Sequence, residues 1–103
     1  MSTTWNCKAG DKHRQLAIDL TDLLTTGATA VRFRMQPREG GTLVVDADGV
    51  IASATRVTYQ FTGTQLDVPG VYLLEVMLTF PDGQETAPTS GHVVVVIEPR
   101  LSA

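Results

Sequence analysis

Apolar and polar residues alternate along most of the chain from residue 13 to its end. The clearest run is Thr55 to Thr62, in which Val57, Tyr59 and Phe61 are separated by polar side chains. A period of two is typical of a β-strand with one face buried and the other exposed to water. The pattern therefore predicts an all-β domain without an internal helix.

Turn signals divide the alternating stretches into short strands. Asp48-Gly49 is typical of a two-residue hairpin turn, because this dipeptide accepts the positive φ angles that such a turn requires. A Pro-Asp-Gly sequence at 81–83 predicts a second turn. We expect strands at about 13–20, 29–36, 42–47, 50–53, 55–62, 71–80 and 92–98, and a weak extended piece at 84–89.

Seven to eight short strands at nearly regular spacing favour an antiparallel β-sandwich of two sheets. Residues 13–99 make up this predicted domain, residues 1–12 a flexible amino-terminal arm and residues 100–103 a carboxy-terminal tail. A chain of 103 residues has room for one hydrophobic core and is long enough to fold without a metal or a disulfide.

Composition argues against several classes of protein. The net charge of -3 has the wrong sign for a protein that binds a phosphate backbone, so no nucleic-acid partner is expected. The longest aliphatic run, Val93 to Ile97, is far too short to span a membrane, and no membrane partner is expected. Cys7 is the only cysteine, which rules out an intrachain disulfide; in a polar arm it is expected to be an incidental thiol.

The sequence contains no convincing catalytic, cofactor-binding or metal-binding group. His13 and His92 lie at the starts of the first and last expected strands, but too few further ligands stand near them for a metal site. Asp46-Ala-Asp48-Gly opens like a calcium loop, yet the later oxygen donors and the closing glutamate are missing. No nucleophile elbow and no phosphate-binding glycine pattern is present. We therefore expect no enzyme and no cofactor.

Three arginines, Arg32, Arg34 and Arg56, are expected to point outward from strands that could share a sheet. Cross-strand pairing with carboxylates such as Asp19 is the ordinary role of such residues on a solvated face. Contact with an acidic partner surface is the alternative.

The expected strands 71–80 and 92–98 carry apolar residues on both faces, whereas an antiparallel sandwich normally buries one face of each sheet. If the two strands are neighbours, their outward residues form one apolar patch, which predicts an interface. The patch consists of Val71, Leu73, Met77, Val94 and Val96. An alternative is that the amino-terminal arm, including Trp5, folds over these residues.

The order of several short motifs resembles that of a known family. The motifs are Leu16-Ala-Ile-Asp-Leu20, Thr26-Gly-Ala-Thr29 before Val31-Arg-Phe-Arg-Met35, Pro69-Gly70-Val-Tyr72, Phe80-Pro-Asp-Gly83 and Val93 to Pro99. Together they resemble the immunoglobulin-like amino-terminal domain of tailed-phage baseplate upper proteins. The resemblance implies an immunoglobulin-like β-sandwich that joins virion components, without catalysis or a cofactor.

In baseplate upper proteins this module anchors a longer chain, whereas here it makes up the whole sequence. The location on the particle is therefore left open: tail or baseplate, neck, head fibre or capsid decoration. The expected partners are other virion proteins or further copies of the chain, assembled in the host cytoplasm. A carbohydrate- or peptide-binding module is the alternative function. For that function only Trp5 and Tyr72 offer aromatic platforms, and the loops Arg38 to Gly41 and Gly63 to Val68 lack them.

Overall fold

The computed structural model describes residues 3–20, 27–87 and 93–99, all within strands, turns or loops. Within these ranges the chain forms nine strands and no helix, and so none that could cross a membrane. The strands are β1 (Thr3–Lys8), β2 (Gln15–Asp19), β3 (Ala30–Pro37), β4 (Val45–Asp48), β5 (Val50–Ser53), β6 (Arg56–Gln60), β7 (Gly70–Phe80), β8 (Gly83–Ala87) and β9 (Val93–Glu98).

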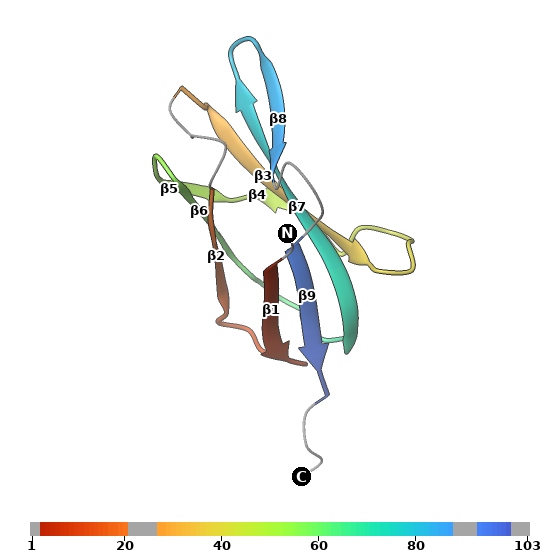
Figure 1. The fold of residues 1–103 in the computed structure, drawn as a ribbon. Helices are drawn as coiled ribbons and strands as arrows, with labels where there is room; N and C mark the ends of the chain where they lie inside the picture. The colour runs from red at the N-terminus through yellow and green to blue at the C-terminus, as the bar shows by residue number, and fades with distance from the viewer. Residues whose placement is uncertain (1–2, 21–26, 88–92, 100–103) are drawn as a thin grey trace.

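The strands form two sheets arranged as a sandwich (Figure 1). The larger sheet has the order β1-β9-β7-β3-β4, with β8 added beside β7, and the smaller sheet has the order β2-β6-β5. All pairs are antiparallel except β1 and β9, which run parallel. The expectation of an all-β sandwich is therefore confirmed.

The core lies between the inner faces of the two sheets, where the alternation of the sequence places its apolar residues. Val57, Tyr59 and Phe61 are buried as expected, and so are the alternate residues Tyr72 to Leu78 of β7. The ring of Tyr59 lies 5.3 Å from that of Phe33 and 5.1 Å from that of Phe61, measured between centroids. Burying each large apolar side chain stabilises the fold by about 1.5–3 kcal/mol.

Strand β7 is longer than its neighbour β9, and the molecule is elongated, with extents of 50 × 25 × 22 Å. The first half of β7 pairs with β9, from Gly70 to Leu74. The second half pairs with β8, from Val76 to Phe80, across the turn that the Pro-Asp-Gly sequence predicts. The β7–β8 hairpin projects at one end of the sandwich (Figure 1).

The amino-terminal segment differs from the expected arm. Within residues 1–12, which were expected to lie outside the sandwich, Thr3–Lys8 form strand β1 and add to the edge of the larger sheet. Trp5 stacks on Phe61 with centroids 5.3 Å apart, and Cys7 is buried in the core. These two inward residues hold β1 in place. Strand β1 is the addition that brings the count to nine, because β8 corresponds to the weak extended piece expected at 84–89.

The expected hairpin at Asp48-Gly49 is also corrected. Strand β4 pairs with β3 in the larger sheet, while β5 pairs with β6 in the smaller one, so the chain crosses between sheets at this point. Gly49 does not have a positive φ angle. A Cβ atom here would overlap the ring of Phe33 and lie 2.6 Å from the carbonyl oxygen of Thr58. Glycine is therefore required by close packing between the sheets.

Candidate functional site

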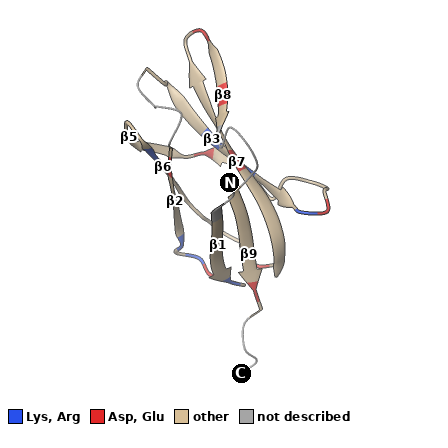
Figure 2. Ribbon diagram, in the orientation of Figure 1, with Lys and Arg blue, Asp and Glu red and all other residues tan. Residues whose placement is uncertain are grey.

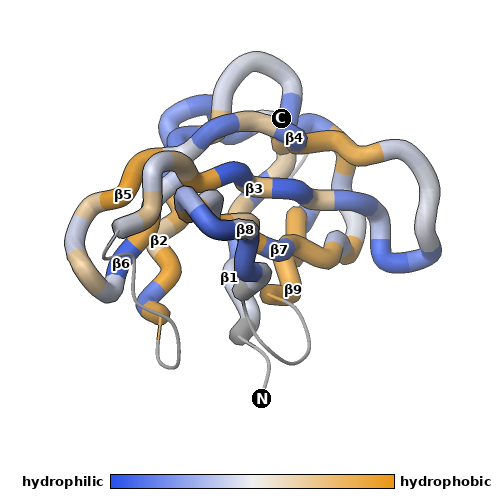
Figure 3. Tube along the Cα trace, turned by 90° about the horizontal axis from the view of Figure 1, so that it is seen from above, coloured by the Kyte–Doolittle hydropathy of each residue, from blue (hydrophilic) through white to orange (hydrophobic). Residues whose placement is uncertain are grey.

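The outer face of the larger sheet carries the apolar patch that the sequence predicts. Strands β7 and β9 are neighbours, and their register sets Val71 opposite Val96 and Leu73 opposite Val94. All four side chains are half-buried. We call these four residues the aliphatic quartet; Figure 3 shows β7 and β9 side by side with much of their length coloured as hydrophobic.

Met77, the fifth residue of the predicted patch, lies on the same face but apart from the quartet. It is half-buried and sits opposite Arg32 of β3 and Thr86 of β8. Glu75 lies between Leu73 and Met77 on this face. Among the described residues the carboxylate of Glu75 has no hydrogen bond and no ion pair, so a charge separates Met77 from the quartet.

The described part of the amino-terminal segment does not cover the quartet. Strand β1 lies beside β9 in the plane of the sheet, with Thr4 next to Val94 and Asn6 next to Val96. The Trp5 ring faces inward, where it stacks on Phe61. The alternative that Trp5 folds over the patch is therefore wrong, and the polar residues Thr4 and Asn6 form one border of the quartet.

A shallow hollow of about 410 Å³ borders the quartet on its other side. Its lining includes Arg34, Gln36, Leu43, Leu73 and Glu75. The Nε atom of Arg34 is buried and makes no hydrogen bond, although it lies 3.4 Å from Oδ1 of Asp46. Leu43 comes from the β3–β4 connection, and its exposed side chain extends the apolar surface beyond Leu73. The sequence pattern does not indicate this hollow, because it predicts a strand over 42–47, whereas Leu43 lies in a loop.

The arginines do not form one basic stripe, because Arg32 and Arg34 belong to the larger sheet and Arg56 to the smaller one. Pairing with carboxylates is confirmed. Arg56 Nε donates to Asp19 Oδ1 at 2.8 Å, and this hydrogen bond lowers the pKa of Asp19.

On the larger sheet, Arg32 Nε donates to Asp46 Oδ1 at 2.6 Å and Arg32 Nη1 donates to Asp48 Oδ1 at 3.2 Å. The hydrogen bond from Arg32 is the main cause that lowers the pKa of Asp46. The two carboxylates that resemble a calcium loop thus face a guanidinium group. In the described ranges no three His, Cys, Asp or Glu side chains converge in a way that could hold a metal ion.

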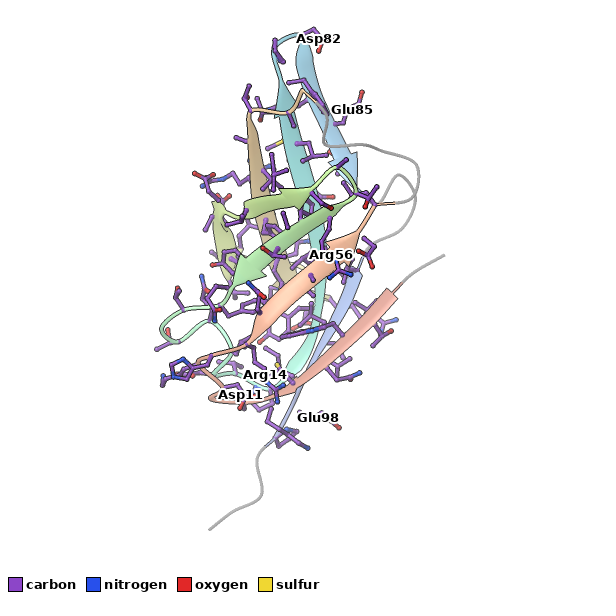
Figure 4. The ribbon with its side chains drawn as sticks, turned by 90° about the vertical axis from the view of Figure 1, so that its left-hand side faces the viewer. Asp11, Arg14, Arg56, Asp82, Glu85 and Glu98 are labelled. Atoms are coloured by element: carbon purple, nitrogen blue, oxygen red, sulfur yellow. The ribbon has the colours of Figure 1, made fainter. Side chains whose placement is uncertain are left out.

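The remaining titratable candidates lie near the β1–β2 loop. Burial raises the pKa of the Cys7 thiol, with Asp11 and Glu98 adding to the effect and Arg14 opposing it. Cys7 is thus a core residue and not the thiol of an exposed arm. Arg14 Nε donates to Asp11 Oδ2 at 2.9 Å, and Figure 4 shows both residues near Glu98, at the end of the molecule opposite Asp82 and Glu85.

His13 is exposed in the same loop, beside a hollow of about 480 Å³ that the loop residues line. His92, expected at the start of the last strand, lies outside the described residues.

The two aromatic platforms considered for sugar binding are both packed inside the protein. Trp5 is half-buried against Phe61. Tyr72 is only 5% exposed, and its hydroxyl group donates to the carbonyl oxygen of Val68 at 2.7 Å. Tyr72 therefore has no free face on which a sugar ring could stack, and Phe61 occupies one face of Trp5.

Charged residues are sparse around the quartet. In Figure 2, strand β9 is free of charge along its length up to Glu98 at its end. Glu98 lies 3.6 Å from Lys8 of β1, measured from Oε2 to Nζ. The face therefore combines an apolar centre with uncharged polar residues on the β1 side and the charged residues Arg34 and Glu75 on the β3 side. No protein-family model and no curated protein matches the chain.

Proposed function

We propose that this chain is a non-enzymatic structural module of a tailed-phage particle, which assembles through the outer face of β7 and β9. The observation that carries the proposal is the aliphatic quartet, which lies open on a sheet face and is bordered by polar residues. An apolar centre with a polar rim is the usual anatomy of a protein–protein interface. The phage context is supported by the resemblance of the sequence motifs to the baseplate family.

We further propose that the sandwich is immunoglobulin-like. The third, seventh and ninth strands share one sheet, and the second, fifth and sixth strands form the other. In immunoglobulin domains, strands C, F and G lie in one sheet and strands B, D and E in the other. Near the start of β7, the Tyr72 hydroxyl binds the carbonyl oxygen of Val68 four residues upstream, as in the tyrosine corner of those domains.

The energy available from the quartet bears on the kind of assembly. Because its side chains are already half-buried, the area they still expose is worth only about 2–3 kcal/mol at ~25 cal/mol per Å². A micromolar complex requires about 8 kcal/mol. The partner must therefore bring a comparable apolar surface, or many copies must act together on a particle. Both conditions suit a repeated virion component, with other virion proteins or copies of the chain itself as partners.

The proposal is tested by incorporation into particles. A tagged chain with Leu73→Glu and Val94→Glu is supplied in cells infected by a phage that carries this gene, and purified particles are analysed by quantitative mass spectrometry. The matched control is Val50→Glu, because Val50 is an exposed valine on the smaller sheet, 62% accessible to solvent. We expect the tagged wild-type chain and the control in particles at a fixed copy number, and the double variant at less than about a tenth of it, as loss of a 1.4 kcal/mol contact implies. Equal incorporation of a folded double variant would refute the proposal.

A further inference from the structure

We propose that the partner seated on the aliphatic quartet is a second copy of this chain, related to the first by a two-fold axis that runs parallel to the strands between β7 and β9. The inference rests on the proposed function, because it names the partner of the same face. In a two-fold interface each surface meets itself, so the patch must be complementary to its own rotated copy.

The register of the sheet satisfies this condition. Rotation about an axis between β7 and β9 places β7 of one copy over β9 of the other. Val71 then faces Val96 of the second copy and Leu73 faces Val94, because these residues stand at the same levels of the sheet. Each contact occurs twice, so eight aliphatic side chains lose water together. A second copy thus supplies the comparable apolar surface that a partner of the quartet needs.

The neighbouring strands match as well. One strand further out, β3 of one copy faces β1 of the other. Gln36 is level with Leu73, and Thr4 is level with Val94, so Gln36 faces Thr4 across the interface. Arg38 is level with Val71 through the bond from its backbone N–H to the Val71 carbonyl oxygen, and it faces Asn6 in the same way. Gln36 and Arg38 can thus donate hydrogen bonds to the uncharged side chains of Thr4 and Asn6 in the second copy.

Other placements of the axis are less favourable. Moving it by one strand, to lie between β3 and β7, sets Leu73 against Gln36 and Val71 against Arg38. A two-fold axis across the strands at the level of Glu75 sets this carboxylate against its own copy. Of these three placements, only the axis between β7 and β9 covers both cross-strand pairs of the quartet with aliphatic side chains.

The size of the face sets the expected affinity. Four strands spaced ~4.8 Å apart and about six residues long give a contact of about 20 Å by 20 Å. This is small beside the ~800 Å² that each partner buries in a standard interface. We therefore expect a weak dimer, with a dissociation constant between about 10 μM and 1 mM.

The test is sedimentation equilibrium of the purified chain up to about 1 mM, the weakest affinity expected from the size of the face. The wild-type chain and the Val50→Glu control are expected to approach twice the monomer mass of 11.1 kDa. Leu73→Lys and Val94→Glu each place a charge against an aliphatic side chain and are expected to weaken the dimer at least 30-fold, roughly the effect of an unpaired interfacial charge. An equimolar mixture of the two variants pairs Lys with Glu at one contact and keeps the second contact intact, so it is expected to recover most of the association.

A wild-type chain that stays at 11.1 kDa up to about 1 mM overturns the inference, and so does a mixture that remains monomeric. A second mixture, of Arg34→Glu with Glu75→Arg, tests the axis between β3 and β7. If this mixture regains dimerisation while the mixture of the Leu73 and Val94 variants does not, the axis lies between β3 and β7 and the inference is overturned. These outcomes are separate from the particle experiment. A monomeric wild-type chain whose double variant is still lost from particles leaves the proposed function standing with a different partner.

Discussion

Replacing Gly49 by alanine is expected to destabilise the sandwich, because this position has no space for a Cβ atom. The added carbon would overlap the Phe33 ring and approach the Thr58 carbonyl oxygen to 2.6 Å. Phe33 is fully buried, with 0% of its surface exposed, so its ring cannot swing into solvent. The second obstacle is backbone within a paired strand and moves even less easily.

The magnitude follows from two opposing effects. Overpacking a core costs about 1–3 kcal/mol, and the two obstacles place Gly49→Ala near the upper end of this range. The loss of glycine freedom in the unfolded chain returns about 0.4–1 kcal/mol. We therefore expect a net loss of about 2 kcal/mol, which lowers the melting temperature by roughly 8–16 °C in a domain of this size.

Urea unfolding measures this loss through the fluorescence of Trp5, the only tryptophan in the chain. Trp5 stacks on Phe61 in the folded protein, so its emission changes on unfolding. A double-mutant cycle with Phe33→Leu isolates the contact with the ring, and the coupling energy is expected to reach about 0.5–3 kcal/mol.

Gly49→Asn separates packing from turn chemistry. Asparagine tolerates the positive φ angle of a hairpin turn. If Gly49 served an ordinary Asp-Gly turn, asparagine would be accepted with little loss. Close packing at this position makes asparagine at least as harmful as alanine. A Gly49→Asn variant within about 0.5 kcal/mol of the wild type, the range of a harmless surface change, would refute the packing explanation.

Two further results are expected. Tyr72→Phe removes the hydrogen bond to the Val68 carbonyl oxygen and should lower the free energy of unfolding by about 1–2 kcal/mol in urea titrations; an unchanged midpoint would mean that the bond has no net value. For Asp19→Asn, the lowered pKa of Asp19 means that its carboxylate stabilises the fold above pH 3.8, its ordinary pKa, and that this contribution is lost as pH falls through the lower folded-state value. The stability difference between wild type and Asp19→Asn should therefore be constant near neutral pH and shrink in acid, and a difference that persists unchanged below the folded-state pKa would contradict it.

The side of each strand that faces the core could be predicted from the sequence, because burial follows directly from alternation. Val57 and Tyr59 show this in β6, and Leu74 and Val76 show it in β7. Strand β1 also alternates through Trp5 and Cys7, but two apolar residues among polar ones are a weak signal. Its position depends on the edge of β9 and on the Phe61 ring, which are distant in sequence.

The assignment of strands to the two sheets could not be predicted as well from the sequence. Alternation places Arg32 and Arg56 outward, yet it does not say that β3 and β6 lie in different sheets. Asp48-Gly49 has the same local chemistry in a hairpin and in a crossing, and the packing of Gly49 against the Phe33 ring, which is distant in sequence, is seen only in the structure. For the candidate site, the residues of the quartet followed from the pattern, whereas the separation of Met77 by Glu75 and the contribution of Leu43 depend on the observed register and on a loop.

The parallel pairing of β1 with β9 has a consequence for the order in which the protein can be completed during synthesis. In the part of the chain that the structure describes, β9 is the neighbour of β1, and it is made last. The first strand therefore waits for the last, and the larger sheet closes only after nearly the whole domain has left the ribosome. The four consecutive valines at 93–96 are the segment most prone to form intermolecular strands. They are synthesised after both of their neighbours in the sheet, β1 and β7. The late arrival of this segment keeps short the time in which a nascent chain could aggregate through it.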